Sequence, residues 1–463
     1  MGSPAQSLAA LLLVALPWLC HADELDRYIA KQTRVHHFPG VVLGVLRNGQ
    51  IVDVRARGLA SVELGVRADR RHRFEIGSIS KQFTAYAVLV LHERGLVELQ
   101  APVGRYLDGL PAAWAAVPIE RLLTHTSGLP DLEAAFGYGV YRETPRDAEF
   151  LARLLALPID FAPGERWSYS NTNYWLLARV IEQVSGQDYG EFMQRNVFLP
   201  LHMSATRSSR PAQLLPGRAA GYRRVGDQLE NREPSQPHTS RGLGDIVSSL
   251  DDMARWEREQ LRPTLVSRAT AELARQPAKL NDGSTFPYGY GLDLDKLLPR
   301  PSIQHTGQMA GFTAAYVRVP ELRLAAVVFV NAYGSPVDSL AIHALRQAEP
   351  SLRQRPWQPM ADADPEITRR VRELLERARS ADTAWREEWF TPEYWKEIRP
   401  WLGEVAETAA RFGPVRRLVL VGRQDQGDER GFVYRVDYAE LSRVIRYRVD
   451  GQGRIASRTL LDE

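Results

Sequence analysis

The strongest constraint on the fold is a helical stretch that is apolar on almost every side. Residues 80–94 combine Phe83, Tyr86 and Leu89 with a run of alanine and valine, and Gly95 supplies a C-terminal stop. A helix without a polar face is usually enclosed at the centre of a domain. The sequence therefore predicts a large domain around this helix, and a chain of 463 residues with 44% hydrophobic residues can supply its core.

Strands are predicted before and after this helix in the sequence, at residues 41–46, 51–55, 312–319 and 324–331. The first two flank Asn48-Gly49, a dipeptide that favours a tight type I′ hairpin. Residues 118–273, which lie between the two pairs, have mainly helical patterns. Strands from both chain ends with helices between them predict an α/β (α+β) domain with an inserted helical subdomain and a site between the two parts.

The first 22 residues have the features of an export signal. Residues 9–19 form an apolar run that is too short to span a bilayer as a helix, and cleavage is predicted before Asp23. Residues 1–7 lack the basic residue that such signals usually carry, so a buried or anchoring helix is the alternative. After cleavage the mature chain has no cysteine, which excludes disulfides and thiolate chemistry. We expect a secreted or periplasmic protein without a stable membrane span.

The C-terminal part of the chain predicts a separate small α+β domain. Helices are expected to start at Pro365 and Pro392. Strands are expected at residues 417–420, 432–438 and 444–449. The predicted organisation is a signal at 1–22, a main domain at 23–349, a linker at 350–365 and a small domain at 366–463. No cluster of chemically active residues stands out in the small domain, so we expect it to stabilise or to dock.

The charge balance excludes some partners. The 59 basic and 56 acidic residues give a net charge of +3, which is too small to indicate binding to nucleic acid or to an anionic membrane. Only five of the basic residues are lysines: Lys31, Lys81, Lys279, Lys296 and Lys396. This scarcity makes any motif that contains a lysine less expected by chance.

One such motif, Ser78-Ile79-Ser80-Lys81, opens the apolar helix. Backbone N–H groups at a helix start favour a developing negative charge on the serine oxygen. A lysine three residues later lies on the same helix face, and burial that lowers its proton affinity would let it take the proton of the serine. An N-cap serine followed by a solvated lysine is the alternative, although this helix offers no obvious solvated face.

Two further motifs each occur once in the chain. Tyr169-Ser170-Asn171 combines a phenol, which can transfer a proton when a cation lowers its pKa, with an amide that can hold a lysine. His305-Thr306-Gly307 precedes a predicted strand, and its glycine allows a substrate backbone to approach closely. Taken alone, a polar capping loop and a strand-edge turn would explain these two motifs better.

Together the three motifs resemble those of the serine β-lactamase and penicillin-binding superfamily, in which Ser-x-x-Lys, Tyr-x-Asn and Lys/His-Thr-Gly follow one another in this order. Residues 122–131, 161–164 and 242–249 also look like segments of that family. The resemblance covers about residues 25–345 and is nearest to class C β-lactamases, D-Ala-D-Ala carboxypeptidases, D-aminopeptidases and related esterases. It implies a β-lactamase/transpeptidase-like antiparallel sheet with an inserted all-helical subdomain.

The resemblance also implies acyl transfer without a metal or cofactor. Ser78 would attack a carbonyl, and Lys81 and Tyr169 would manage its proton. The backbone N–H groups of Ser78 and Gln308 would form the oxyanion hole. The expected substrate is a small molecule or peptide, such as one derived from a cell wall, and the reaction is hydrolysis of a D-amino-acid amide, an ester or, weakly, a β-lactam. The alternative is a penicillin-binding receptor or scaffold that is acylated without turnover.

The same resemblance implies a set of substrate-binding residues. Asn171 would position the substrate amide, and His305, Thr306 and Gly307 would bind a carboxylate or an ester carbonyl. Because a neutral imidazole holds a carboxylate less strongly than an ammonium does, a histidine in place of the lysine of efficient β-lactamases predicts weak or no penicillin turnover. His125 is interpreted as a turn residue that shapes the helical subdomain.

Two other hydrolase classes do not fit the sequence. No serine has a glycine two residues before it, as the nucleophile turn of an α/β-hydrolase requires. His92-Glu93 lacks the second histidine of a zinc hydrolase motif.

Overall fold

The computed structural model describes residues 24–225, 228–294, 298–354, 356–379, 385–399, 402–425 and 429–461. The predicted signal at 1–22 and its cleavage site lie outside these residues. Contacts divide the chain into two compact units. The described part of the first unit covers residues 24–30 and 37–352, and the second unit comprises residues 31–36 and the described residues from 353 onward.

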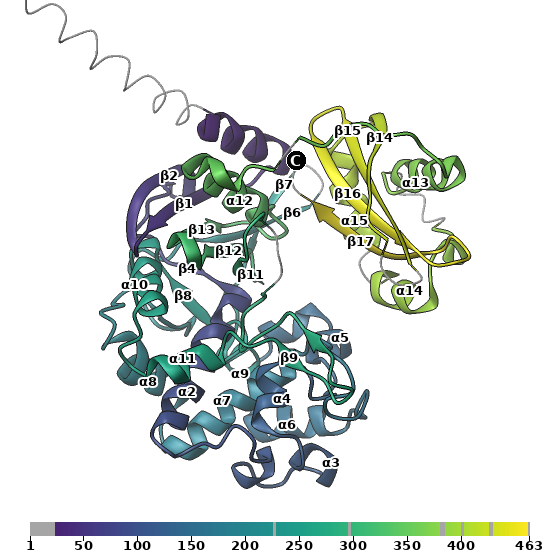
Figure 1. The fold of residues 1–463 in the computed structure, drawn as a ribbon. Helices are drawn as coiled ribbons and strands as arrows, with labels where there is room; N and C mark the ends of the chain where they lie inside the picture. Colours follow the sequence, from purple (N-terminus) through teal and green to yellow (C-terminus); the bar gives the residue numbers. More distant parts are fainter. Residues whose placement is uncertain are drawn as a thin grey trace, which may run out of the picture. The chain divides into compact units, whose positions relative to one another are not determined.

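The first unit is built on a six-stranded antiparallel sheet (Figure 1). In sheet order the strands are β11 (Ile303–Met309), β12 (Phe312–Val319), β13 (Leu324–Val330), β1 (Gly40–Arg47), β2 (Gln50–Ser61) and β3 (Val66–Arg67). β1 lies between β2 and β13, with Val42 opposite Phe329. The two ends of this unit's sequence therefore meet in one sheet, as predicted, and β11 forms an edge of that sheet.

The strands of this sheet alternate between two cores, as the period of a β-strand requires. Val42 and Phe329 face the larger core, which includes residues of α10 (Leu250–Leu261). Val41 and Val328 face a second core, which α12 (Val337–Ala348) and the first turns of a helix over residues 24–36 complete. At the β1–β2 turn, Asn48 and Gly49 have φ values of 54° and 74°, as a type I′ hairpin requires.

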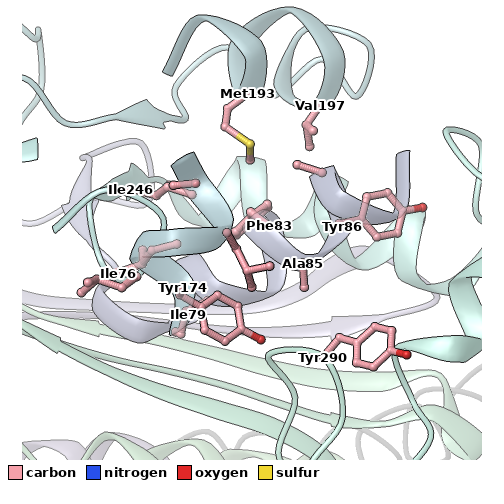
Figure 2. Close-up of a cluster of buried hydrophobic side chains, with 14 of the residues drawn as sticks. Ile76, Ile79, Phe83, Ala85, Tyr86, Tyr174, Met193, Val197, Ile246 and Tyr290 are labelled. Atoms are coloured by element: carbon pink, nitrogen blue, oxygen red, sulfur yellow. The ribbon is translucent and has the colours of Figure 1, made fainter. Parts of the chain in front are cut away.

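The predicted central helix is α2 (Ser80–Glu93), and every residue from Ser80 to Leu91 is buried. The Phe83 ring lies 4.3 Å from that of Trp256 between centroids. Figure 2 shows Phe83 and Tyr86 on this helix among apolar side chains from several other elements. The burial of α2 on all sides fixes the position of the residues that precede it.

Short helices and small sheets form the rest of the first unit. The helices are α3 (Ala112–Ala115), α4 (Ile119–Leu123), α5 (Leu132–Phe136), α6 (Asp147–Leu155), α7 (Asn171–Ser185), α8 (Tyr189–Met193), α9 (Pro237–Ser240) and α11 (Arg268–Leu273). The small sheets consist of β4 (Phe74–Glu75), β8 (Ile246–Ser248) and β5 (Arg207–Ser208), of β6 (Gly221–Val225) and β7 (Gln228–Arg232), and of β9 (Ala278–Lys279) and β10 (Thr285–Phe286). Helices are therefore the main regular structure from 118 to 273, as predicted, but the strands β5, β6, β7 and β8 also lie in this region.

The second unit has a four-stranded antiparallel sheet whose strands follow chain order. They are β14 (Val415–Arg423), β15 (Arg430–Tyr438), β16 (Ser442–Val449) and β17 (Ile455–Leu461), with helices α13 (Pro365–Arg377), α14 (Pro392–Ile398) and α15 (Leu402–Arg411). The sequence predicts only three strands and two helices here. β17 was missed because its side chains are mostly half-buried or exposed, which leaves no clear alternation of apolar residues.

The boundaries of the two units differ from the predicted ones at two points. The first unit ends at Leu352, inside the segment predicted as a linker. Residues 31–36, predicted to lie in the main domain, belong to the second unit. Val35 is 5% exposed within that unit's core, and the His36 ring packs edge-on against Phe412 at 5.7 Å. These contacts explain the assignment of residues 31–36.

No helix in the described ranges is both long and apolar enough to cross a bilayer. Likewise, the described residues contain no group of three or more His, Cys, Asp or Glu side chains that could hold a metal ion.

Candidate active site

Ser78 lies in a single 3₁₀ turn, Gly77–Ile79, that leads directly into α2. Ser78 is half-buried, whereas Gly77 and Ile79 are buried. The preceding strand β4 pairs with β8 of the segment 242–249. The predicted nucleophile therefore sits at a junction of strand and helix and keeps part of its surface exposed.

Lys81, one turn further along, has no exposed surface. Its Nζ donates to Ser78 Oγ at 3.0 Å, to Asn171 Oδ1 at 2.9 Å and to the Leu243 carbonyl at 2.9 Å. All three acceptors are neutral. Burial lowers the pKa of Lys81 to about 7, while the more distant charges of Asp131 and Glu133 act in the opposite direction. The lysine can therefore lose its proton near neutral pH.

Tyr169 lies near the Ser78 hydroxyl, and its ring centroid lies 4.9 Å from Lys81 Nζ. Burial raises the pKa of Tyr169 above its usual range, although the nearby Ser78 hydroxyl acts to lower it. From the sequence we expect a nearby cation to lower this pKa, but burial outweighs any such effect. At neutral pH the side chain is a phenol, which can donate a proton.

Asn171 is the first residue of α7 and is 6% exposed. Its backbone N–H donates to Asp131 Oδ1 at 2.7 Å, which ties the start of the helix to the loop before α5. Because its Oδ1 accepts from Lys81, its Nδ2 carries the N–H donors that could bind a substrate carbonyl.

The turn that carries Ser78 touches the edge strand β11 at two glycines. A Cβ atom at Gly307 would lie 1.9 Å from Ile76 O, and one at Gly77, where φ is 52°, would lie 2.4 Å from Gln308 N. Only glycine at both positions allows this approach. It brings the backbone of Ser78 next to that of Gln308, which are the two predicted oxyanion-hole donors.

His305 and Thr306 lie on the same strand but differ in exposure. Thr306 is exposed, whereas His305 is 7% exposed and both of its ring nitrogens have partners. Nδ1 donates to Thr306 O at 2.6 Å, and Nε2 accepts from the Tyr288 hydroxyl at 3.0 Å. Burial, assisted by the charge of Lys81, lowers the pKa of His305 to about 4. The imidazole is therefore neutral and offers no free donor in this arrangement, so its predicted contact with substrate stays a prediction.

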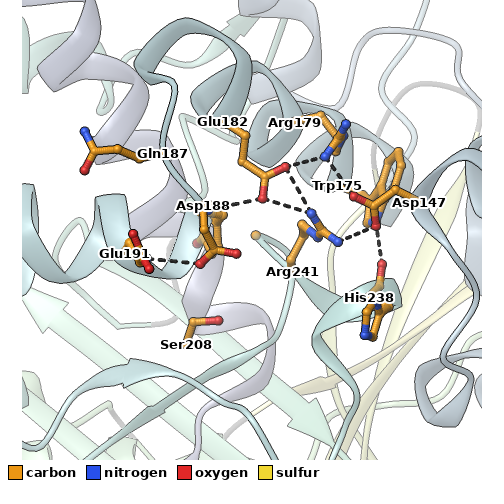
Figure 3. A network of polar contacts seen from close by, with 12 residues as sticks. Asp147, Trp175, Arg179, Glu182, Gln187, Asp188, Glu191, Ser208, His238 and Arg241 are labelled. Atoms are coloured by element: carbon orange, nitrogen blue, oxygen red, sulfur yellow. Dashed lines mark hydrogen bonds and ion pairs between the residues drawn. The ribbon is translucent and has the colours of Figure 1, made fainter.

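The segment that supplies the Leu243 carbonyl is held by ion pairs (Figure 3). Arg241 donates to Glu182 Oε1 at 2.9 Å and is also paired with Asp147. Arg179 bonds the same aspartate at 2.8 Å. These contacts anchor the segment to α6 and α7, and thereby fix the third acceptor of the Lys81 ammonium.

Aromatic rings surround the tyrosine. His125 is fully buried, with its ring 4.2 Å from that of Tyr169, and its φ of 57° is that of a turn residue, as predicted. Nearby, Trp167 and Phe286 stack at 4.2 Å with an angle of 10° between their planes. Both of these are half-buried, so they form an apolar surface next to the site.

Sequence reasoning missed two contributors to this site. The Leu243 carbonyl lies in the segment 242–249, which resembles the family but had no assigned role. Tyr288 lies outside every motif, and only the folded chain places its hydroxyl on His305.

The site combines a serine, a buried lysine bonded to it and a neighbouring phenol, next to the edge of an antiparallel sheet. This arrangement defines a class of serine acyl-transfer proteins. The family model described as Beta-lactamase matches residues 25–349, and the chain belongs to this family. The predicted resemblance and fold class are thereby confirmed.

Individual relatives agree with this assignment. Penicillin-binding protein 4* of Bacillus subtilis is 31% identical over 313 residues, which cover 64% of this chain and 68% of that protein. A D-aminopeptidase of Brucella canis is 29% identical over 74% of this chain and 65% of its own length. The chain thus spans about two thirds of these relatives. An octameric penicillin-binding protein homologue from Pyrococcus abyssi has a similar fold, with a TM-score of 0.65 at 21% identity over 94% of both chains.

Proposed function

We propose that this protein is a serine hydrolase that forms an acyl-enzyme through Ser78. The observation that carries the proposal is the hydrogen bond of a fully buried lysine to the serine hydroxyl, with only neutral groups as its other acceptors. A lysine with a pKa of about 7 is neutral in about half of the molecules at pH 7, so it can act as the general base.

The proton then has a defined route. Neutral Lys81 takes the proton of Ser78 as the oxygen attacks the substrate carbonyl, and the N–H groups of Ser78 and Gln308 stabilise the oxyanion. Tyr169, which is a phenol at neutral pH, donates a proton to the leaving alcohol or amine and recovers one from the lysine. Water then attacks the ester on Ser78 with Lys81 again as the base, and this releases the acid and restores the serine.

The proposed substrates are amides or esters of small molecules or peptides, with D-amino-acid derivatives first among them. The D-aminopeptidase named above supports this choice. Penicillin turnover is expected to be weak, because the neutral His305 cannot supply the positive charge that holds a β-lactam carboxylate. We further propose that the protein is exported by the segment 1–22 and works in the periplasm or outside the cell.

The test uses a p-nitrophenyl ester, a D-alanine p-nitroanilide and a fluorophosphonate probe, with wild type beside Ser78→Ala. We expect steady release of p-nitrophenol, labelling of one serine, and loss of turnover by at least about 10⁴-fold in the variant. The exposed Ser284, which lies in a surface turn, provides the matched Ser→Ala control. A single burst without further turnover would favour the receptor or scaffold, and rapid sustained hydrolysis of nitrocefin would overturn the proposal on β-lactams.

A further inference from the structure

His125 accepts hydrogen bonds from the residues directly before and after Tyr169 in the sequence. The His125 carbonyl accepts from the backbone N–H of Ser168 at 2.9 Å, and His125 Nδ1 accepts from the backbone N–H of Ser170 at 3.2 Å. The backbone N–H groups of the two residues that flank the tyrosine are therefore both bonded to His125, although more than forty positions separate it from them in sequence.

The His125 ring also contacts the tyrosine directly. Its centroid lies 4.2 Å from that of Tyr169, 5.0 Å from Tyr288 and 5.2 Å from Tyr174. Because the histidine has no exposed surface, these rings limit its rotation, and it limits theirs. The orientation of the phenol toward Ser78 therefore depends on the position of this imidazole.

The hydrogen bonds fix the tautomer of His125. A backbone N–H can only donate, so Nδ1 must be the acceptor, and it also accepts from Asn173 Nδ2 at 3.1 Å. A protonated imidazole would lose both bonds. Burial, with the nearby positive charge of Lys81, keeps the pKa of His125 well below its usual value, so the neutral acceptor form persists.

The backbone of His125 is in the left-handed region, which glycine adopts without strain and which asparagine, aspartate and histidine adopt more readily than other residues. The exposed His202 has the same φ, so the backbone conformation alone gives the imidazole no role. What the histidine adds is the ring, with its acceptor nitrogen and its packing surface on Tyr169.

We propose that His125 is the positioning residue for Tyr169, and that its carbonyl, its Nδ1 and its ring together hold the phenol against the Ser78 hydroxyl. The inference rests on the proposed function, because it assigns the histidine a part in the acylation of Ser78. It differs from the role of a simple turn residue, which would not depend on the acceptor nitrogen.

The test compares His125→Asn with His125→Leu. The two substitutes have nearly the same shape, but only the asparagine Oδ1 replaces Nδ1 as an acceptor. We expect kcat for the p-nitrophenyl ester to fall by about 100-fold in His125→Leu and by less than about 5-fold in His125→Asn, with KM little changed in both. The rate of fluorophosphonate labelling is expected to fall by the same factors in the two variants.

Backbone strain and folding need separate controls. His202 also has a φ of 57° but is exposed and far in sequence from the motifs, so His202→Leu measures the cost of leucine in this conformation. Thermal melting checks the fold of each variant. Should His125→Leu fail to fold, His125→Gly takes its place, because glycine suits the backbone and lacks the acceptor.

The outcomes separate this inference from the proposed function. If wild type neither turns over the ester nor reacts with the fluorophosphonate, the proposed function fails. If wild type is active and the asparagine, leucine and glycine variants have equal kcat, the turn alone matters and the positioning role is wrong. A loss confined to KM would also contradict it.

Discussion

Two buried cations in the first unit have opposite surroundings. Lys81, with 0% exposure, is bonded to two side-chain oxygens and a carbonyl, none of them charged. Arg318 on β12, with 1% exposure, is bonded through Nε to Glu257 Oε2 at 2.6 Å and through Nη2 to Glu257 Oε1 at 3.3 Å. Burial lowers the pKa of the lysine, whereas the attached carboxylate raises that of the arginine.

A buried cation has two requirements, which are partners for its hydrogen bonds and a compensating negative charge. Neutral acceptors satisfy its hydrogen bonds but do not supply the negative charge that would offset the loss of water. A carboxylate does both, and it keeps the cation charged. The site around Lys81 is therefore suited to proton transfer, and the pair between β12 and α10 is suited to a structural role.

The largest effect is expected from Lys81→Met, which removes the titrating group. Without the base, kcat for the ester should fall by about 10⁴-fold. Folding stability should be unchanged or higher, because a cation without a carboxylate partner no longer has to be buried. Enzyme assays and urea unfolding measure the two quantities, with the exposed Lys279→Met as control. Strong destabilisation by Lys81→Met would show that this lysine is structural like Arg318.

Glu257→Gln should lower folding stability and leave activity unchanged, which is the opposite of the result expected for Lys81→Met. It leaves the Arg318 guanidinium buried without a countercharge and should lower the free energy of unfolding by about 3–5 kcal/mol, while kcat per folded molecule stays near the wild-type value. Glu366→Gln is the control, because it breaks an exposed ion pair with Arg369 and should cost less than about 1 kcal/mol. A loss of kcat at full stability would mean that the two regions are not independent.

Asn171→Asp gives Lys81 a carboxylate acceptor. It tests whether the missing carboxylate is the reason why the pKa of Lys81 is lowered whereas that of Arg318 is raised. The charge should raise the pKa of Lys81 by about 1–3 units. The rising limb of kcat/KM, expected near pH 7 in wild type because the neutral lysine is the base, should move upward by the same amount. Initial rates between pH 5 and 10 measure this shift. If the rising limb of kcat/KM does not move, it reports the titration of a group other than Lys81.

The smallest expected effect is a change in the free energy of unfolding with pH. The pKa of Lys81 is about 7 when folded and 10.5 when free, so between these values the unfolded chain binds one proton more. The free energy of unfolding contributed by this group therefore rises with pH across that window, by up to about 1.4 kcal/mol per unit, and is lowest below pH 7. Urea unfolding at several pH values should show the slope in wild type and a smaller one in Lys81→Met. Arg318 contributes none, since it is charged in both states.

Local chemistry was readable from the sequence, and contacts between distant segments were not. Ser78 and Lys81 are one helical turn apart, so their meeting follows from helix geometry. The Asn48-Gly49 turn likewise follows from the φ values that these residues tolerate. The Leu243 carbonyl and the Tyr288 hydroxyl reach the site only through packing, and any residue type could supply a carbonyl. His125 was recognised as a turn residue, but its bonds on both sides of Tyr169 exist only in the folded chain.

The position of β1 sets the order in which this protein can fold. During synthesis β1 can pair at once with β2, but its other edge stays open until β13, near the end of the first unit, has been made. Open strand edges are sites of mispairing and aggregation. This edge needs protection until β13 has been made, so overproduction is expected to depend on holding chaperones more than on the stability of the finished fold.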